Sequence, residues 1–179
     1  MWYFSNRSDD PDQGMRFDLE RPAGTCYLAT DPVSALIEKL SDPDDEAPLI
    51  TTSVLDRIVV WTGELLFAWS VADVADRGAR ITLEIGTLTP YDQGPWLWAD
   101  ALHADSRGGI RWRLRFDPEQ GIGVAIFGPA SSPDELPDPG EWPDLDVCVP
   151  ATHWVEELSD AFDIVDDTPS LDDLDIVEL

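Results

Sequence analysis

Three residues with chemically capable side chains stand at equal spacing near the start of the chain: Arg16, Tyr27 and Glu38, with eleven positions from each to the next. A guanidinium donates paired hydrogen bonds in a geometry that suits a pyrophosphate. A phenol can stack on a flat ring or hydrogen-bond to a hydroxyl group. A carboxylate can stabilise the positive charge that develops on a sugar when its glycosidic bond breaks. These residue types are suited to holding a pyrophosphate and to stabilising positive charge on a sugar, if the fold brings them together.

Each of the three also has an ordinary structural interpretation. Glu38 taken alone is typical of a solvated helix residue. Tyr27 lies in an apolar stretch, where a buried core tyrosine would give the same pattern. Arg16 is close enough in sequence to Asp18 and Glu20 to form a surface ion pair.

The elements that must position these residues follow from local signals. Residues 25–29 predict a short strand, after which Asp31 suits a helix N-cap and Pro32 the first helical position. The predicted helix runs to about Leu40, and its apolar stripe consists of Val33, Leu36, Ile37 and Leu40. Glu38 lies off that stripe, on the side of Ser34, and therefore points into a cleft or into water.

Residues 110–116 alternate strictly between apolar side chains and arginines, which predicts a strand with one arginine face. Residues 123–127 predict its antiparallel hairpin partner. The arginine face, made by Arg111, Arg113 and Arg115, either contacts an anion or keeps an exposed edge strand polar against aggregation.

The remaining pattern predicts strands at 58–61 and 64–70, a helix from residue 95 that ends near Gly108, and a short helix and final strand in the tail. Strands outnumber helices and mix with them irregularly, which favours an α+β fold with mixed, mostly antiparallel strands. We expect one compact domain over 1–179, with a proline-rich excursion at about 131–143 and an acidic C-terminal segment, 144–179.

The charge limits the partners. Thirty-seven acidic residues against eleven basic ones give a net charge of −26. Such a surface repels polynucleotides and anionic membranes, so we expect direct contact with neither. The first residues do not resemble a signal peptide and no uncharged stretch is long enough to span a bilayer, which favours a cytoplasmic protein. A genome rich in G and C or a saline cytoplasm produces the same composition.

We expect no metal site. Cys26 and Cys148 lack metal-type spacing and are expected to be reduced and buried. His103 and His153 have no acidic or cysteine partner at ligand spacing.

The stretch from Gly14 to Glu38 resembles the opening half of RES domains, a family named for an Arg, a Glu and a Ser. Short segments that follow the order of the family's second half are 88–91, 98–102, 109–112, 114–118 and 125–128. The resemblance covers roughly residues 2–128. Leu114 stands where the family's serine would fall, and Arg115 follows it.

This resemblance implies an ADP-ribosyltransferase-like fold and an enzyme that consumes NAD⁺ as a substrate, without a metal. The nicotinamide–ribose bond would be cleaved, and the acceptor would be water, phosphate or a protein side chain. The family also implies a toxin of a toxin–antitoxin pair, an Xre-type antitoxin as partner, and a homodimer by analogy. Carried over to this sequence, the catalytic residues are Arg16, Tyr27 and Glu38. The residues implied in NAD binding are Arg16, Phe17, Tyr27, Trp112, Arg113 and Arg115.

Two other functional classes remain open at this point. Leu114 in place of serine suits a degenerate relative that binds NAD without turnover. The acidic composition suits an interaction protein, an immunity-type inhibitor or a mimic of nucleic acid. A nucleic-acid mimic, however, has no reason to carry four arginines within 107–115.

Overall fold

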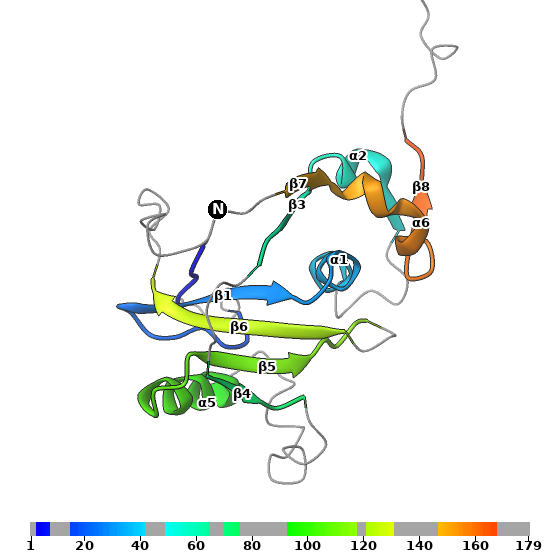
Figure 1. Cartoon of the computed structure of the whole chain (residues 1–179). Coiled ribbons are helices and arrows are strands. Elements are labelled where there is room, and N and C mark those ends of the chain that lie inside the picture. The colour runs from blue at the N-terminus through cyan, green and yellow to red at the C-terminus, as the bar shows by residue number, and fades with distance from the viewer. Residues whose placement is uncertain are drawn as a thin grey trace, which may run out of the picture.

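The structure is a computed structural model and describes residues 3–7, 15–41, 49–64, 70–75, 93–117, 121–130 and 147–167. Its main element is a four-stranded sheet in the order β1-β6-β5-β4 (Figure 1). These strands are β1 (Ala23–Ala29), β6 (Ile122–Pro129), β5 (Gly109–Arg113) and β4 (Val71–Asp73). Strand β6 is antiparallel to both neighbours, and β4 is parallel to β5. The predicted antiparallel pairing of 110–116 with 123–127 is therefore confirmed, except that β5 ends at Arg113 and not at residue 116.

The register of this sheet decides which side chains share a face. Tyr27 is opposite Ala125, which is opposite Ile110, and Trp112 is opposite Gly123. Residues directly opposite one another point to the same side, so all five belong to one face. A Cβ on Gly123 would lie 2.5 Å from Cζ2 of Trp112, so only glycine leaves room for the indole here.

Helix α5 (Gln93–Ala104) covers this face of the sheet. The core formed there contains Phe17, Leu19, Ala99, Ile110, Trp112, Leu114, Ala125 and Phe127. The apolar members of β5 thus serve as core, which explains half of the alternation seen in the sequence.

Helix α1 (Pro32–Leu40) follows β1 directly and begins as the sequence predicts. Asp31 is the N-cap, its Oδ1 accepting a hydrogen bond of 2.8 Å from the Ser34 backbone N–H, and Pro32 comes next. Its buried residues Leu36 and Ile37 belong to the predicted apolar stripe.

Removing the cap should destabilise this helix. We expect Asp31→Ala to lower the free energy of unfolding by about 1 kcal/mol, because one N-terminal backbone donor loses its acceptor. Urea denaturation followed by tryptophan fluorescence measures this change. Asp31→Asn, which keeps an acceptor oxygen, should recover most of the loss; an equal loss in both variants would assign the effect to charge.

A second core lies on the other side of α1, which Figure 1 shows between the main sheet and the remaining elements. These elements are β2 (Leu49–Thr51), α2 (Thr52–Leu55), β3 (Val59–Thr62), β7 (Val147–Pro150), a 3-10 turn (Ala151–Trp154), α6 (Val155–Leu158) and β8 (Asp163–Val165). Strand β2 pairs in parallel with β8, and β3 pairs antiparallel with β7. The second core contains Leu36, Ile37, Ile50, Leu55, Ala151, Leu158 and Phe162.

The predicted α+β class with mixed, mostly antiparallel strands is confirmed, since three of the five strand pairs in the described part of the chain are antiparallel. Strand β3 pairs with β7, whereas the sequence had suggested a turn into 64–70; residues 65–69 lie outside the described residues. The excursion at 131–143 also lies outside them. Strand β4 pairs with residues 109–111 of β5, so the edge-strand interpretation of the arginine face is wrong at Arg111.

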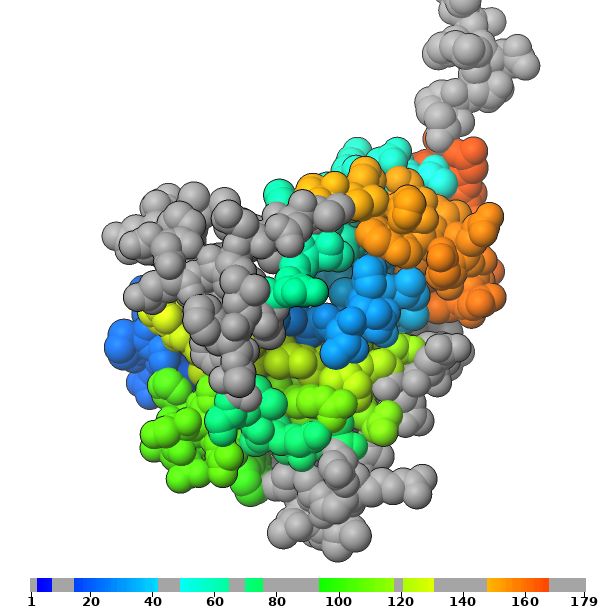
Figure 2. All heavy atoms as spheres, viewed as in Figure 1, coloured from blue at the N-terminus to red at the C-terminus, as the bar shows by residue number. Residues whose placement is uncertain are grey.

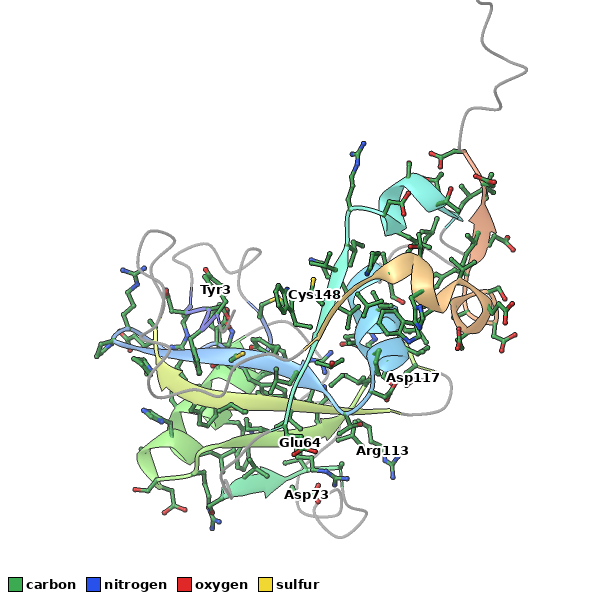
Figure 3. All side chains as sticks on the ribbon, turned by 45° about the horizontal axis from the view of Figure 1, so that its top comes forward. Tyr3, Glu64, Asp73, Arg113, Asp117 and Cys148 are labelled. Atoms are coloured by element: carbon green, nitrogen blue, oxygen red, sulfur yellow. The ribbon has the colours of Figure 1, made fainter. Side chains whose placement is uncertain are left out.

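The expectation that both cysteines are buried is wrong for one of them. Cys26 is buried in the main sheet, but Cys148 is exposed on β7 (Figure 3). Among the described residues, strand β7 pairs only with β3, in a two-stranded ribbon, one face of which also exposes Val59 and Trp61. Neither cysteine is in a disulfide.

The two thiols should react very differently. Burial raises the pKa of the Cys26 thiol to about 11, so it carries almost no thiolate near neutral pH. With a chromogenic disulfide reagent we expect one fast thiol per chain, and a second only after unfolding. Cys148→Ser should remove the fast thiol; if Cys26→Ser removes it instead, the assignment is reversed.

In the described residues, no helix combines the length and apolar character needed to cross a membrane.

Candidate functional site

Four of the predicted site residues come together between the sheet and α5. The rings of Phe17 and Tyr27 meet Trp112 edge-on, with centroid distances of 5.0 Å and 6.1 Å. The Arg16 guanidinium lies over the Phe17 ring at 5.9 Å. Arg16 is only 7% exposed, so the surface position assumed in its structural interpretation is wrong. We call Arg16, Phe17, Tyr27 and Trp112 the aromatic cluster.

The Tyr27 hydroxyl is fixed by two hydrogen bonds. It accepts one from the Phe17 backbone N–H at 2.7 Å and donates one to Oδ1 of Asp18 at 3.2 Å. Burial, and then the nearby Asp18 carboxylate, raise the pKa of the Tyr27 phenol well above its usual value. Tyr27 therefore stays protonated at neutral pH and cannot serve as a general base.

Asp18 holds the segment that carries Arg16 and Phe17. Its side chain is almost completely buried and accepts hydrogen bonds from Ser5 Oγ at 2.6 Å and from the Met15 N–H at 2.8 Å, in addition to Tyr27. The Phe17 carbonyl is held separately by Thr25 Oγ1 at 2.8 Å. From the sequence alone, Asp18 is only an ion-pair partner for Arg16. Its position between two apolar residues that prove to be core, Phe17 and Leu19, is the sequence signal that could have indicated its burial.

Glu38 lies in a second group, on α1. Its Oε2 accepts a hydrogen bond of 3.3 Å from the Arg115 N–H. One turn earlier on the helix, Ser34 contacts Asp117 at 2.6 Å, and Figure 3 shows Asp117 beside α1. The side of α1 that carries Ser34 and Glu38 thus faces the segment after β5. Figure 2 shows the molecular surface hollowed between α1 and β3.

The structure therefore divides the three catalytic candidates. Arg16 and Tyr27 belong to the aromatic cluster, and Glu38 belongs with Arg115. The short chain from Trp112 to Arg115 connects the two groups, because Trp112 packs on Tyr27 and the Arg115 N–H reaches Glu38.

The predicted phosphate-binding arginines are not all near the aromatic cluster. Arg113 is exposed and on the opposite face of β5 from the buried Trp112, because successive strand residues alternate. Arg111, on the same face as Arg113, forms an ion pair of 2.7 Å with Asp73 of the neighbouring strand; Figure 3 labels Arg113 and Asp73. The Arg115 guanidinium lies over the Phe116 ring at 5.2 Å.

Two buried residues bear on whether the aromatic cluster can hold a ligand. Nε1 of Trp112 is buried and has no hydrogen-bond partner among the residues that the structure describes. A buried donor of this kind needs an acceptor from a ligand or an ordered water. Leu114, which the sequence resemblance aligns with the family's serine, is buried in the same core, and its side chain has no polar atom.

No group of three or more His, Cys, Asp or Glu side chains in the described residues could hold a metal ion. The two histidines pack edge-on against aromatic rings, His103 against Phe127 and His153 against Trp154.

Comparison with known proteins gives one match. The family model of the RES domain matches residues 2–146. Neither the curated proteins nor the solved structures contain a significant match to the chain. Since the family match covers most of the 179 residues and includes both groups of candidate residues, the chain belongs to the RES-domain family.

Proposed function

We propose that this protein is an enzyme that degrades NAD⁺ by cleaving the bond between nicotinamide and ribose. The observation that carries the proposal is that the chain's match to the RES domain, a family of NAD-processing enzymes, includes a buried cluster of Arg16, Phe17, Tyr27 and Trp112. The cluster offers flat aromatic rings, a guanidinium and one buried N–H donor.

The reaction needs little from the protein besides binding and charge stabilisation. The glycosidic C–N bond breaks, and its electron pair leaves with neutral nicotinamide. The ribosyl group passes through a cation, which a carboxylate stabilises where the charge develops. Glu38 is our candidate for that carboxylate, because it is partly accessible on α1 and its contact with the Arg115 N–H leaves one oxygen available.

The aromatic cluster would bind and orient the dinucleotide. A protonated Tyr27 contributes ring packing and a fixed hydroxyl, since the raised pKa excludes base catalysis by this group. Arg16 supplies the guanidinium that lies over the Phe17 ring. Arg115, whose backbone N–H reaches Glu38, carries a second guanidinium, which lies over the Phe116 ring. Both are suited to pyrophosphate oxygens.

The direct test is the release of nicotinamide from NAD⁺ by purified protein, measured by chromatography with and without inorganic phosphate. Release without phosphate identifies water as the acceptor, and release that requires phosphate identifies a phosphorylase. Release only with added protein, together with labelling of that protein, identifies ADP-ribosyl transfer.

A second candidate function rests on Leu114. A leucine buried at the serine position suits a relative that binds NAD⁺ without turnover. Calorimetric binding of NAD⁺ without nicotinamide release would favour this alternative. Neither binding nor release would overturn the proposal and favour an acidic interaction protein.

The buried Trp112 N–H gives a sharper prediction about substrate binding. Trp112→Phe should raise the KM for NAD⁺ about three- to tenfold, because one hydrogen bond to the ligand is lost while a flat ring remains. Steady-state kinetics measure the change. Trp98→Phe, at an exposed position on α5, is the matched control and should leave KM unchanged. An unchanged KM in Trp112→Phe would show that Nε1 does not contact the substrate.

The family context adds the biological proposal. RES proteins occur as toxins with Xre-type antitoxins, and depletion of NAD⁺ in the cytoplasm would make this chain toxic to its own cell. Expression in a bacterial host should arrest growth, and Glu38→Gln should relieve the arrest. A homodimer remains a proposal from the family alone.

A further inference from the structure

We infer that Asp18 is a positioning residue of the proposed NAD⁺ site, acting through the hydroxyl of Tyr27 to hold the aromatic cluster in its binding geometry. This inference rests on the proposed function for its kinetic consequence, but its structural part can be tested without turnover.

The contacts of the Asp18 carboxylate set the direction of each hydrogen bond. An ionised carboxylate only accepts, so Ser5 Oγ, Tyr27 Oη and the Met15 N–H must all donate to it. Because the Tyr27 proton points at Asp18, a lone pair of Oη is left for the Phe17 N–H at 2.7 Å. One accepted and one donated hydrogen bond therefore fix the position of the Tyr27 hydroxyl.

The same carboxylate also shapes the segment that presents Arg16. Its Oδ2 bonds to the Met15 N–H, and the Asp18 N–H donates back to the Met15 carbonyl at 3.3 Å. Arg16 and Phe17 are the two central residues of this turn. One buried side chain therefore fixes three of the four members of the aromatic cluster.

The N-terminal segment completes the arrangement. Ser5 bonds to the Asp18 side chain, and Nη2 of Arg7 bonds to the Asp18 carbonyl at 3.3 Å and to Asp100 of α5 at 2.8 Å. Asp18 is thus held from outside the cluster by groups that do not touch Tyr27. This rigidity is what a positioning residue needs.

The inference predicts that the effects of Asp18 and Tyr27 on catalysis depend on one another. Asp18→Asn and Tyr27→Phe should each lower kcat/KM about ten- to hundredfold, as expected when a hydrogen bond to a charged group is lost. The double variant should be no worse than the poorer single one, because the same contact is removed twice. Independent effects that multiply would overturn the inference.

Thr25→Val is the matched control for a purely structural role. It removes another buried hydrogen bond to the same segment, at the Phe17 carbonyl, but leaves Asp18 and the Tyr27 hydroxyl untouched. Its effect should multiply with that of Tyr27→Phe. If the effect of Thr25→Val on kcat/KM also fails to multiply with that of Tyr27→Phe, Asp18 only stabilises the fold and the inference fails.

A readout independent of NAD⁺ separates this inference from the proposed function. The chain has three tyrosines, so the titration of Tyr27 must be separated from the other two. The tyrosinate absorbance of each protein is measured with and without the Tyr27→Phe substitution, and the difference reports Tyr27 alone. Asp18→Asn should make Tyr27 ionise at lower pH, because a neighbouring negative charge is gone. Thr25→Val should not. An unchanged titration in a folded Asp18→Asn protein overturns the inference, whereas absent nicotinamide release in the wild type overturns only the proposed function.

Discussion

Glu38→Gln should lower the rate of nicotinamide release about 10²–10³-fold, the loss expected when one group that stabilises transition-state charge is removed. The substitution keeps the shape of the side chain, and the amide oxygen can still accept the Arg115 N–H. Only the negative charge is lost. The KM for NAD⁺ should change little, because the charge acts on the cation and not on the bound substrate. Single-turnover measurement of nicotinamide checks this prediction.

The control for Glu38→Gln is Glu157→Gln, which removes the same charge from an exposed position on α6. This control should retain full activity and shows whether total charge matters. Thermal unfolding of both variants should match the wild type. If Glu38→Gln retains turnover, another carboxylate performs this role and our assignment on α1 is wrong.

Leu114→Ser, which would restore the serine of the family pattern, should destabilise the protein by about 3 kcal/mol without raising activity. Leu114 is buried in the same core as Trp112, between the main sheet and α5. A serine there leaves a cavity and buries a hydroxyl among apolar neighbours. Urea denaturation measures the loss, and nicotinamide release measured well below the unfolding transition tests the activity.

Leu97→Ser is the matched control for this substitution. Leu97 is 67% exposed on α5, so the same chemical change should alter the free energy of unfolding by no more than about 0.5 kcal/mol. A stable Leu114→Ser protein with increased turnover would contradict the prediction. It would also show that position 114 contacts the substrate in a conformation other than this one.

Local signals in the sequence predicted the elements near the site well. Asp31 and Pro32 fixed the start of α1, and the alternation at 110–116 identified both β5 and its hairpin with β6. Such signals work because capping and strand alternation depend on a few neighbouring residues. The position of Glu38 on the side of Ser34 also followed from helix geometry alone.

Long-range pairing could not be predicted in the same way. Nothing local to 58–62 shows that β3 pairs with Val147–Pro150, and nothing local to Asp18 shows that it meets Ser5 and Tyr27. The division of the site has a similar cause. Equal spacing in sequence suggested one constellation, but α1 begins directly after β1 and turns Glu38 toward Arg115, away from the turn that carries Arg16.

The pairing of β2 with β8 and of β3 with β7 also determines when the protein can finish folding. Each pair joins segments separated by about a hundred residues of chain, so closing these loops is slow and depends on late-synthesised residues. During translation the apolar side of α1 can pack against Ile50 and Leu55 early, but the core around it lacks Ala151, Leu158 and Phe162 until residues 147–165 leave the ribosome. A nascent chain that already contains all the candidate site residues should therefore remain incompletely folded and vulnerable to proteases until its last elements arrive.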